Sequence, residues 1–278
     1  MLNWTRTARR LSVTLIATGL ALAACERQAP TAPKPSPPPP SSPTAETAPP
    51  RLPTLPPPAL RRSDVLLALD AASSAYAAGR PDEAENLAGR RFAIRQAFGC
   101  PGSPPADDGD DAGRARWGWN AKKTAIELRL QPADWTQAPI LADGDHWEAV
   151  EGFWLERPWL RAEGCPAAAG GPQVEAPPPP SPQTAGLAAV FEHGGSRVGR
   201  RNGKAFSFTI RGEPAPQPSA TGYRLVLEGR FTAFPDGRAI RCRADSPDRR
   251  PLCIAAAEID RVAFEDGEGK LLSEWRPA

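Results

Sequence analysis

Residues 124–130, TAIELRL, alternate apolar and charged side chains. In an extended chain the three aliphatic side chains would lie on one face, with Glu127 and Arg129 on the other. This period of two is typical of a β-strand that is buried on one side. Similar alternation occurs in residues 206–210, 223–231 and 259–264, with turn signals at PDG (235–237) and EDG (265–267). The second half of the chain is therefore predicted to be mostly antiparallel β.

The segment before these strands has helical spacing. Ser63 is placed to cap a first helix, whose apolar positions Leu66, Leu69 and Tyr76 continue until Gly79. A second helix is predicted to start at Pro81, because acidic residues follow in its first turn. The apolar positions of this second helix would be Leu87, Ile94 and Phe98.

These patterns together predict an α+β fold. An N-terminal helical hairpin would be followed by mostly antiparallel β, as one body or as two small lobes. Residues 172–184 contain six prolines and are expected to form a loop or a boundary. This stretch separates residues 61–171, with the hairpin and a tryptophan-rich α/β part, from residues 185–278, with the antiparallel part.

The first 24 residues have the layout of a secretory signal peptide. Arg6, Arg9 and Arg10 form a positively charged start, and residues 11–22 are uncharged and mostly apolar. At about 1.5 Å per residue this apolar stretch is shorter than the ~30 Å hydrocarbon core that a spanning helix must cross. We therefore expect residues 1–24 to be removed.

The string LAAC at residues 22–25 resembles the lipobox of bacterial lipoproteins. The resemblance implies cleavage between Ala24 and Cys25, a diacylglycerol on the Cys25 thiol and an acylated new amino group. Because each buried CH₂ contributes about 0.8 kcal/mol, two or three acyl chains would hold the protein on a bilayer. Glu26 stands where enteric lipoproteins that stay at the inner membrane have Asp, which favours the outer membrane, facing the periplasm. The alternative is a soluble export signal.

Residues 26–60 contain 14 prolines in 35 positions. Such a segment buries too little apolar surface to fold, and fixed proline φ angles keep it extended. We expect a disordered, semi-rigid stalk between the lipid anchor and the body, with a Pro-rich ligand for an aromatic groove as the alternative.

The charge balance argues against one class of partner. The formal net charge of +2 includes three arginines of the signal peptide, and without them 31 basic residues face 32 acidic residues. Nucleic-acid binding is therefore not expected, because it depends on a clear excess of basic groups.

Four cysteines remain once Cys25 is lipidated. Exported proteins meet an oxidising compartment, so two disulfides are predicted, with three possible pairings. Cys242 and Cys253 flank a polar stretch between two strand-like runs, which favours a bridge across a hairpin and leaves Cys100 for Cys165. A metal site is the rival interpretation, but no CxxC pair occurs and both histidines are isolated.

Acidic residues suggest two possible sites. Asp143, Asp145, His146, Glu148 and Glu151 lie within nine residues, where paired carboxylates could hydrolyse a glycosidic bond and His146 and Glu148 would share one face of a strand. A solvated turn is the favoured alternative. The run DDGDD at 107–111 could attract Ca²⁺, but it does not follow the EF-hand order and is also expected to be a solvated loop. No cofactor fingerprint occurs, so we expect neither a cofactor nor a metal.

Tryptophans and arginines provide candidate binding surfaces. Six indoles lie within residues 117–159, and an exposed row of them could stack on sugars, whereas core packing is the alternative. The densest basic cluster lies in residues 194–204, where it could hold an anionic polymer or lipid headgroup, with a solvated turn as the alternative. The candidate binding residues are Trp117, Trp119, Trp154, Trp159, Arg197, Arg200 and Arg201.

The strings WGWN at 117–120 and EGFWLERPW at 151–159 resemble a group of proteobacterial envelope lipoproteins of undefined function. Our leading hypothesis is a non-enzymatic binding or structural module of the cell envelope, held on the bilayer through acylated Cys25. Its partner would be an envelope protein or a glycan. The alternative hypothesis is an envelope glycan hydrolase that uses carboxylates near His146.

Overall fold

The computed structural model describes residues 56–81, 87–103, 105, 112–141, 146–166 and 183–277. Several predictions lie outside the described residues: the signal peptide, Cys25, nearly all of the stalk, the acidic run at 107–111, Asp143, Asp145, and most of the Pro-rich stretch at 172–184. The described residues form one compact unit. Among them, no helix is long and apolar enough to cross a membrane.

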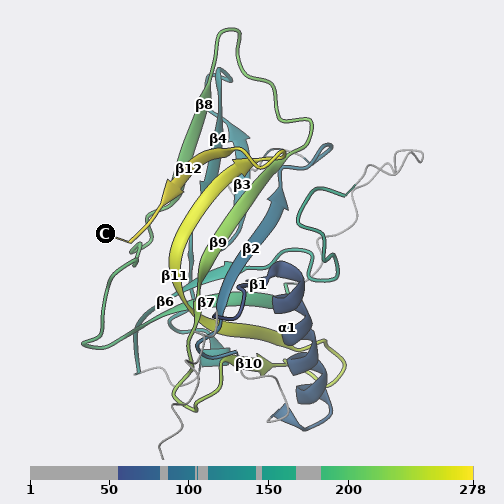
Figure 1. The fold of residues 1–278 in the computed structure, drawn as a ribbon, viewed down its shortest axis with the longest axis vertical. Coiled ribbons are helices and arrows are strands. Elements are labelled where there is room, and N and C mark those ends of the chain that lie inside the picture. The colour runs from purple at the N-terminus through teal and green to yellow at the C-terminus, as the bar shows by residue number, and fades with distance from the viewer. Residues whose placement is uncertain are drawn as a thin grey trace, which may run out of the picture. The chain divides into compact units, whose positions relative to one another are not determined.

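β-Strands are the main regular structure of the described chain, with 41% strand against 11% helix (Figure 1). The larger sheet is mixed, and β10 (Ile240–Arg243) and β12 (Leu271–Trp275) pair with its central strand, β11. The other strands follow the order β1 (Leu60–Arg61), β2 (Arg91–Phe98), β9 (Tyr223–Phe231), β11 (Leu252–Asp266), β7 (Ala185–Glu192), β6 (Trp147–Trp154) and β5 (Ala133–Asp134).

A second, antiparallel sheet contains β3 (Ala115–Trp119), β4 (Ala125–Leu130) and β8 (Phe206–Arg211). In β4 the side chains of Ile126, Leu128 and Leu130 are fully buried, whereas Glu127 and Arg129 are exposed. The alternation in residues 124–130 therefore predicts this strand correctly. The strands expected near 206–210, 223–231 and 259–264 are also present.

The long strand β11 connects the parts of the larger sheet. Its first half pairs with β10 and lies parallel to β7, and its second half pairs antiparallel with β9 and β12. The register against β9 shifts between Ile259 and Arg261, which is a bulge, and bulges bend the strand that carries them. Figure 1 shows β11 as a long, strongly curved arrow.

The expectation of an α+β fold with possible lobes is wrong. β2 and β6 come from residues 61–171, yet they pair with β9 and β7 from residues 185–278. One sheet therefore combines strands from both sides of the Pro-rich stretch in the sequence. The parallel pairing of β7 with β11 is also an exception to the antiparallel arrangement expected for the second half.

The first predicted helix is present as α1 (Arg62–Ala77), but its start differs from the expectation. Ser63 lies inside the helix, and the Arg61 backbone N–H donates to the Asp64 carboxylate at 2.9 Å. Val65, Leu66 and Leu69 are buried, and α1 lies against β10, β11 and β2 (Figure 1).

The second predicted helix is wrong, because Arg91–Phe98 is strand β2. Phe92, Ile94, Gln96 and Phe98 are all nearly fully buried, so the true period is two. The polar Gln96 at a core position hides this period in the sequence. Its amide is satisfied by the Trp154 carbonyl and by the Glu156 backbone N–H, which compensates for its burial.

Both predicted disulfides are present. Cys100 pairs with Cys165, and Cys242 pairs with Cys253. Cys242 and Cys253 are directly opposite each other in the β10–β11 ladder. This bridge therefore closes the base of the loop formed by residues 244–251, which we call the 244–251 loop.

Candidate ligand-binding site

The tryptophans lie mostly in the interior. Trp117 is buried, and its ring centroid is 6.5 Å from that of the half-buried Trp119, so the two share one side as expected. Trp154 is also half-buried, and its ring packs edge-on against buried Trp135 at 4.6 Å. Trp159 is 60% exposed. These positions do not form an exposed row of rings, which weakens the case for a sugar-stacking platform.

The predicted arginine cluster, which we call the 194–204 loop, is engaged within the molecule. Arg197 and Arg200 both bind the Glu148 carboxylate, at 2.8 and 2.6 Å. Arg201 donates to the backbone carbonyls of Lys204 and Ala205, and its guanidinium lies 4.4 Å from the centroid of the Phe206 ring. Two arginines of the loop therefore share one internal carboxylate, and the third uses its guanidinium on backbone carbonyls and on the Phe206 ring.

A bulge in β6 explains how Glu148 reaches this loop. The register of β6 against β7 shifts between Trp147 and Ala149, so Glu148 is the extra residue. Trp147 and Val150 pack in one core cluster, and Ala149 packs in the other. A regular strand would place residues 148 and 151 on opposite faces, whereas here Glu148 and Glu151 both bind the 194–204 loop.

Glu148 and Glu151 differ in their protonation behaviour. The hydrogen bond from Arg197 is the main cause that lowers the pKa of Glu148. Burial raises the pKa of Glu151, although its carboxylate accepts the backbone N–H groups of Arg201 and Asn202 at 2.7 and 2.8 Å. Glu151 also lines a cavity of about 320 Å³ between this loop and β11.

His146 makes a different contact from the one predicted. Its Nε2 lies 3.5 Å from a carboxylate oxygen of Glu192, and its ring packs edge-on against Trp147. The structure therefore gives His146 and Glu148 different partners. Among the residues that the structure describes, no three His, Cys, Asp or Glu side chains are grouped to hold a metal ion.

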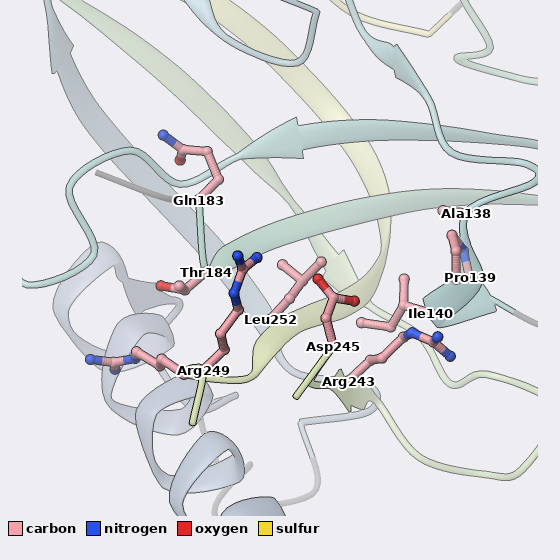
Figure 2. A pocket seen from close by; sticks show the side chains of 10 residues that line it. Ala138, Pro139, Ile140, Gln183, Thr184, Arg243, Asp245, Arg249 and Leu252 are labelled. Atoms are coloured by element: carbon pink, nitrogen blue, oxygen red, sulfur yellow. The ribbon is translucent and has the colours of Figure 1, made fainter. Parts of the chain in front are cut away.

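A larger cavity, of about 490 Å³, lies at one edge of the main sheet (Figure 2). The parallel strands β7 and β11 begin there, with Ala185 opposite Cys253, and β10 ends there with Arg243 opposite Leu252. The residues just before or after these strands therefore meet. The lining comes from residues 138–140, from Gln183 and Thr184, and from residues 243–252.

Three charged side chains of this cavity have no partner among the described residues. Arg243, Asp245 and Arg249 form no side-chain ion pair or hydrogen bond with any described residue, and all three are exposed. Figure 2 shows Arg249 and Asp245 between Thr184 and Ile140, with Arg243 beside Ile140. These three groups leave a net charge of +1 beside an apolar wall that includes Ile140 and Leu252.

Two features hold the 244–251 loop in place. The Cys242–Cys253 bridge closes its base. Arg250 forms an ion pair with Asp70 of α1, which also binds Arg161 at 3.0 Å. The cavity is therefore fixed on the side of α1.

The cavity lining also includes a buried acceptor, on the side chain of Gln183. The side-chain oxygen Oε1 of Gln183 is buried and has no hydrogen-bond partner among the described residues. The next residue, Thr184, is fixed because its carbonyl accepts the Cys253 N–H at 2.9 Å. Since buried polar atoms normally have partners, Gln183 Oε1 is suited to a donor on a ligand or a water molecule.

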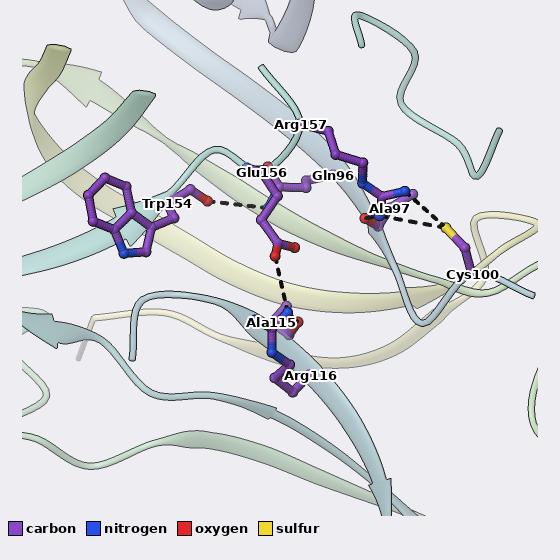
Figure 3. A network of polar contacts seen from close by, with 8 residues as sticks. All are labelled: Gln96, Ala97, Cys100, Ala115, Arg116, Trp154, Glu156 and Arg157. Atoms are coloured by element: carbon purple, nitrogen blue, oxygen red, sulfur yellow. Dashed lines mark hydrogen bonds and ion pairs between the residues drawn. The ribbon is translucent and has the colours of Figure 1, made fainter. Parts of the chain in front are cut away.

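A third polar network serves the scaffold (Figure 3). The Glu156 carboxylate pairs with Arg116 at 3.0 Å, and Arg157 donates to the Ala97 carbonyl at 3.3 Å. Nearby Arg62 is 2% exposed and donates to the carbonyls of Glu156, Arg157 and Leu160. Burial, followed by the charge of Arg157, lowers the pKa of Arg62 to about 10. This network ties α1 to the segment after β6.

Sequence reasoning missed the larger cavity. Arg243, Arg249 and Gln183 are far apart along the chain and come together only through the β7–β11 pairing. The one available signal was the polar stretch between Cys242 and Cys253, which reads as a disulfide-closed loop rich in arginine. Comparison with known proteins gives no match for this chain, whether with protein-family models, curated proteins or solved structures.

Proposed function

We propose that this protein is a non-enzymatic binding module of the bacterial cell envelope that takes an anionic ligand in the cavity of about 490 Å³. The observation that carries the proposal is the presence of Arg243 and Arg249 on its wall without an acidic partner among the described residues. Guanidinium groups bind carboxylates and phosphates through paired hydrogen bonds. The volume lies within the range of about 300–1,000 Å³ that is usual for small-molecule sites.

The lipid anchor at Cys25 is part of this proposal. The lipobox-like LAAC string supports it, and the Pro-rich stalk would hold the body away from the bilayer, on the periplasmic side of the outer membrane. The test is a Cys25→Ser variant with palmitate labelling. We expect the variant to lose the label and to leave the membrane fraction, and an unlabelled wild-type chain would contradict the anchor.

The binding proposal is tested with anions and matched arginine variants. We expect the double variant Arg243→Ala/Arg249→Ala to weaken the binding of carboxylate and phosphate probes about tenfold or more, because charge-assisted hydrogen bonds are lost. Arg197→Ala, a matched control in the 194–204 loop, should bind as the wild type does. If the double variant binds every probe as the wild type does, the proposed function is wrong.

Glycan hydrolysis is the second candidate function. It is favoured by one observation, that Glu148 and Glu151 face the same loop with pKa values shifted in opposite directions. Acid–base pairs of hydrolases are built in this way. The test is release of reducing sugar from envelope glycans by the wild type and by Glu151→Gln. We expect no release from either, and release that only the wild type gives would establish the hydrolase.

A further inference from the structure

We infer that the cavity recognises a monocarboxylated sugar, such as a hexuronic acid unit. The inference rests on the proposed function, since it names the ligand class of the same site. It follows from the charge of the wall, from its hydrogen-bonding groups and from its apolar part.

The charge of the wall favours an anion. Arg250 shares Asp70 with Arg161, and the charged groups of the wall without a partner among the described residues are Arg243, Arg249 and Asp245, with a net charge of +1. A carboxylate can bind a guanidinium through paired hydrogen bonds, and it brings less negative charge next to Asp245 than a phosphate dianion does. A zwitterionic amino acid could bind Arg249 and Asp245 together, but it would leave the wall positive.

The remaining polar groups require hydrogen-bond donors on the ligand. Gln183 Oε1 is a buried acceptor without a described partner, and the Asp245 carboxylate is a second acceptor. Thr184 adds a hydroxyl that can donate or accept. A simple carboxylate such as acetate has nothing to donate to Gln183, whereas the hydroxyls of a sugar do.

The apolar part of the wall suits the carbon face of a ring. Pro139 and Ile140 lie on the opposite side from Thr184, and Leu252 lies between them (Figure 2). Small-molecule sites usually combine such an apolar surface with a few polar groups that orient the ligand. A hexuronic acid has all three features: one carboxylate, several hydroxyls and a C–H face.

The experiment is calorimetric titration of the full-length mature chain in detergent with sodium D-glucuronate, acetate, phosphate, glucose and L-alanine. We expect glucuronate to bind with a dissociation constant of about 1 mM or below, and each of the others at least about tenfold more weakly. Gln183→Leu should weaken glucuronate binding about 3- to 10-fold and leave acetate unchanged, because one hydrogen bond is lost. Arg197→Ala is the control and should bind glucuronate normally.

A measurement on the wild-type protein tests the inference even where a variant does not fold. Phenylglyoxal modifies accessible arginines, so bound glucuronate should protect Arg243 and Arg249, but not Arg197, in peptide mass spectra. If phosphate, acetate or alanine binds as tightly as glucuronate in an Arg249-dependent way, the sugar-acid inference fails and the anion-binding function stands. If no probe binds and no arginine is protected, both fail. A titration with tri-galacturonate shows whether the site takes a unit of a polymer or a free sugar acid. A site for a polymer unit would bind tri-galacturonate more tightly than glucuronate.

Discussion

The 194–204 loop and the 244–251 loop both carry arginines, yet they differ in what those arginines contact. In the first loop Arg197 and Arg200 share Glu148, which a β-bulge turns towards them. In the second, Arg250 is paired with Asp70, while Arg249, with Arg243 at the end of β10, faces a cavity. The availability of a basic group therefore depends on acids from elements distant in the sequence, Glu148 on β6 and Asp70 on α1, and the density of arginines along the sequence does not reveal it.

Removal of the Cys242–Cys253 bridge should have the largest effect on this contrast. We expect Cys242→Ala/Cys253→Ala to lower the free energy of unfolding by about 2–4 kcal/mol, because the bridge restricts the unfolded chain. The 244–251 loop should loosen, while the 194–204 loop, which has no disulfide at its base, keeps its contacts. Urea denaturation measures the free energy of unfolding. Amide hydrogen exchange measures the loosening of each loop, and equal loosening of both loops would contradict the contrast between them.

Replacement of Glu148 should leave arginines of the 194–204 loop without an acidic partner, as in the 244–251 loop. Glu148→Ala removes the shared partner of Arg197 and Arg200, so we expect later elution from a heparin column than for the wild type. Glu192→Ala, at an exposed position beside His146, makes the same charge change and serves as the control. Because the pKa of Glu148 is lowered, its carboxylate stays ionised through the ordinary carboxyl range. Its ion pairs are lost only as pH falls through the lowered value. The difference in elution should shrink in that acidic range.

Glu151 should give the 194–204 loop an opposite pH dependence. Burial raises its pKa, so the folded state holds this proton more tightly than the unfolded chain does. Stability should therefore be greatest below the ordinary carboxyl pKa and fall as pH rises through the raised value. Glu151→Gln keeps an acceptor for the two backbone N–H groups and should flatten this dependence, with a change of about 1 kcal/mol or less. Thermal unfolding between pH 4 and 7 tests it, and an unchanged slope would count against the assignment.

A smaller effect than the loss of the disulfide is expected at the support of the 244–251 loop. Asp70→Asn removes two partly exposed ion pairs, with Arg161 and Arg250, which contribute about 0.2–1 kcal/mol each. Ligand affinity should also fall, because Arg250 no longer holds the 244–251 loop against α1 and the arginines of the cavity lose their fixed positions. Arg161→Ala removes the other ion pair of Asp70, leaves Arg250 paired, and is the control. A loss of stability without any change in affinity would show that Asp70 does not position the loop.

The sequence predicted those parts of the fold in which each residue type agrees with its local environment. Residues 124–130 form β4 because their alternation matches a half-buried strand, and the predicted pairing of four cysteines into two disulfides is present. β2 was mistaken for a helix because Gln96 occupies a core position, where distant partners satisfy its amide. The bulge at Glu148 and the meeting of Gln183 with Arg249 depend on strand pairing, which local patterns do not encode.

The place of β11 near the end of the chain has a consequence for how the molecule is assembled. β2 is made early, but its long partner β9 and the strand β11 beyond it are made last. A chain that emerges from its N-terminus thus leaves β2 with only the two-residue β1 as a neighbour until the final quarter appears. Topologies dominated by such distant pairings mature slowly. The body therefore closes only after these strands are made, and shortening the C-terminal strands should block folding of the whole body.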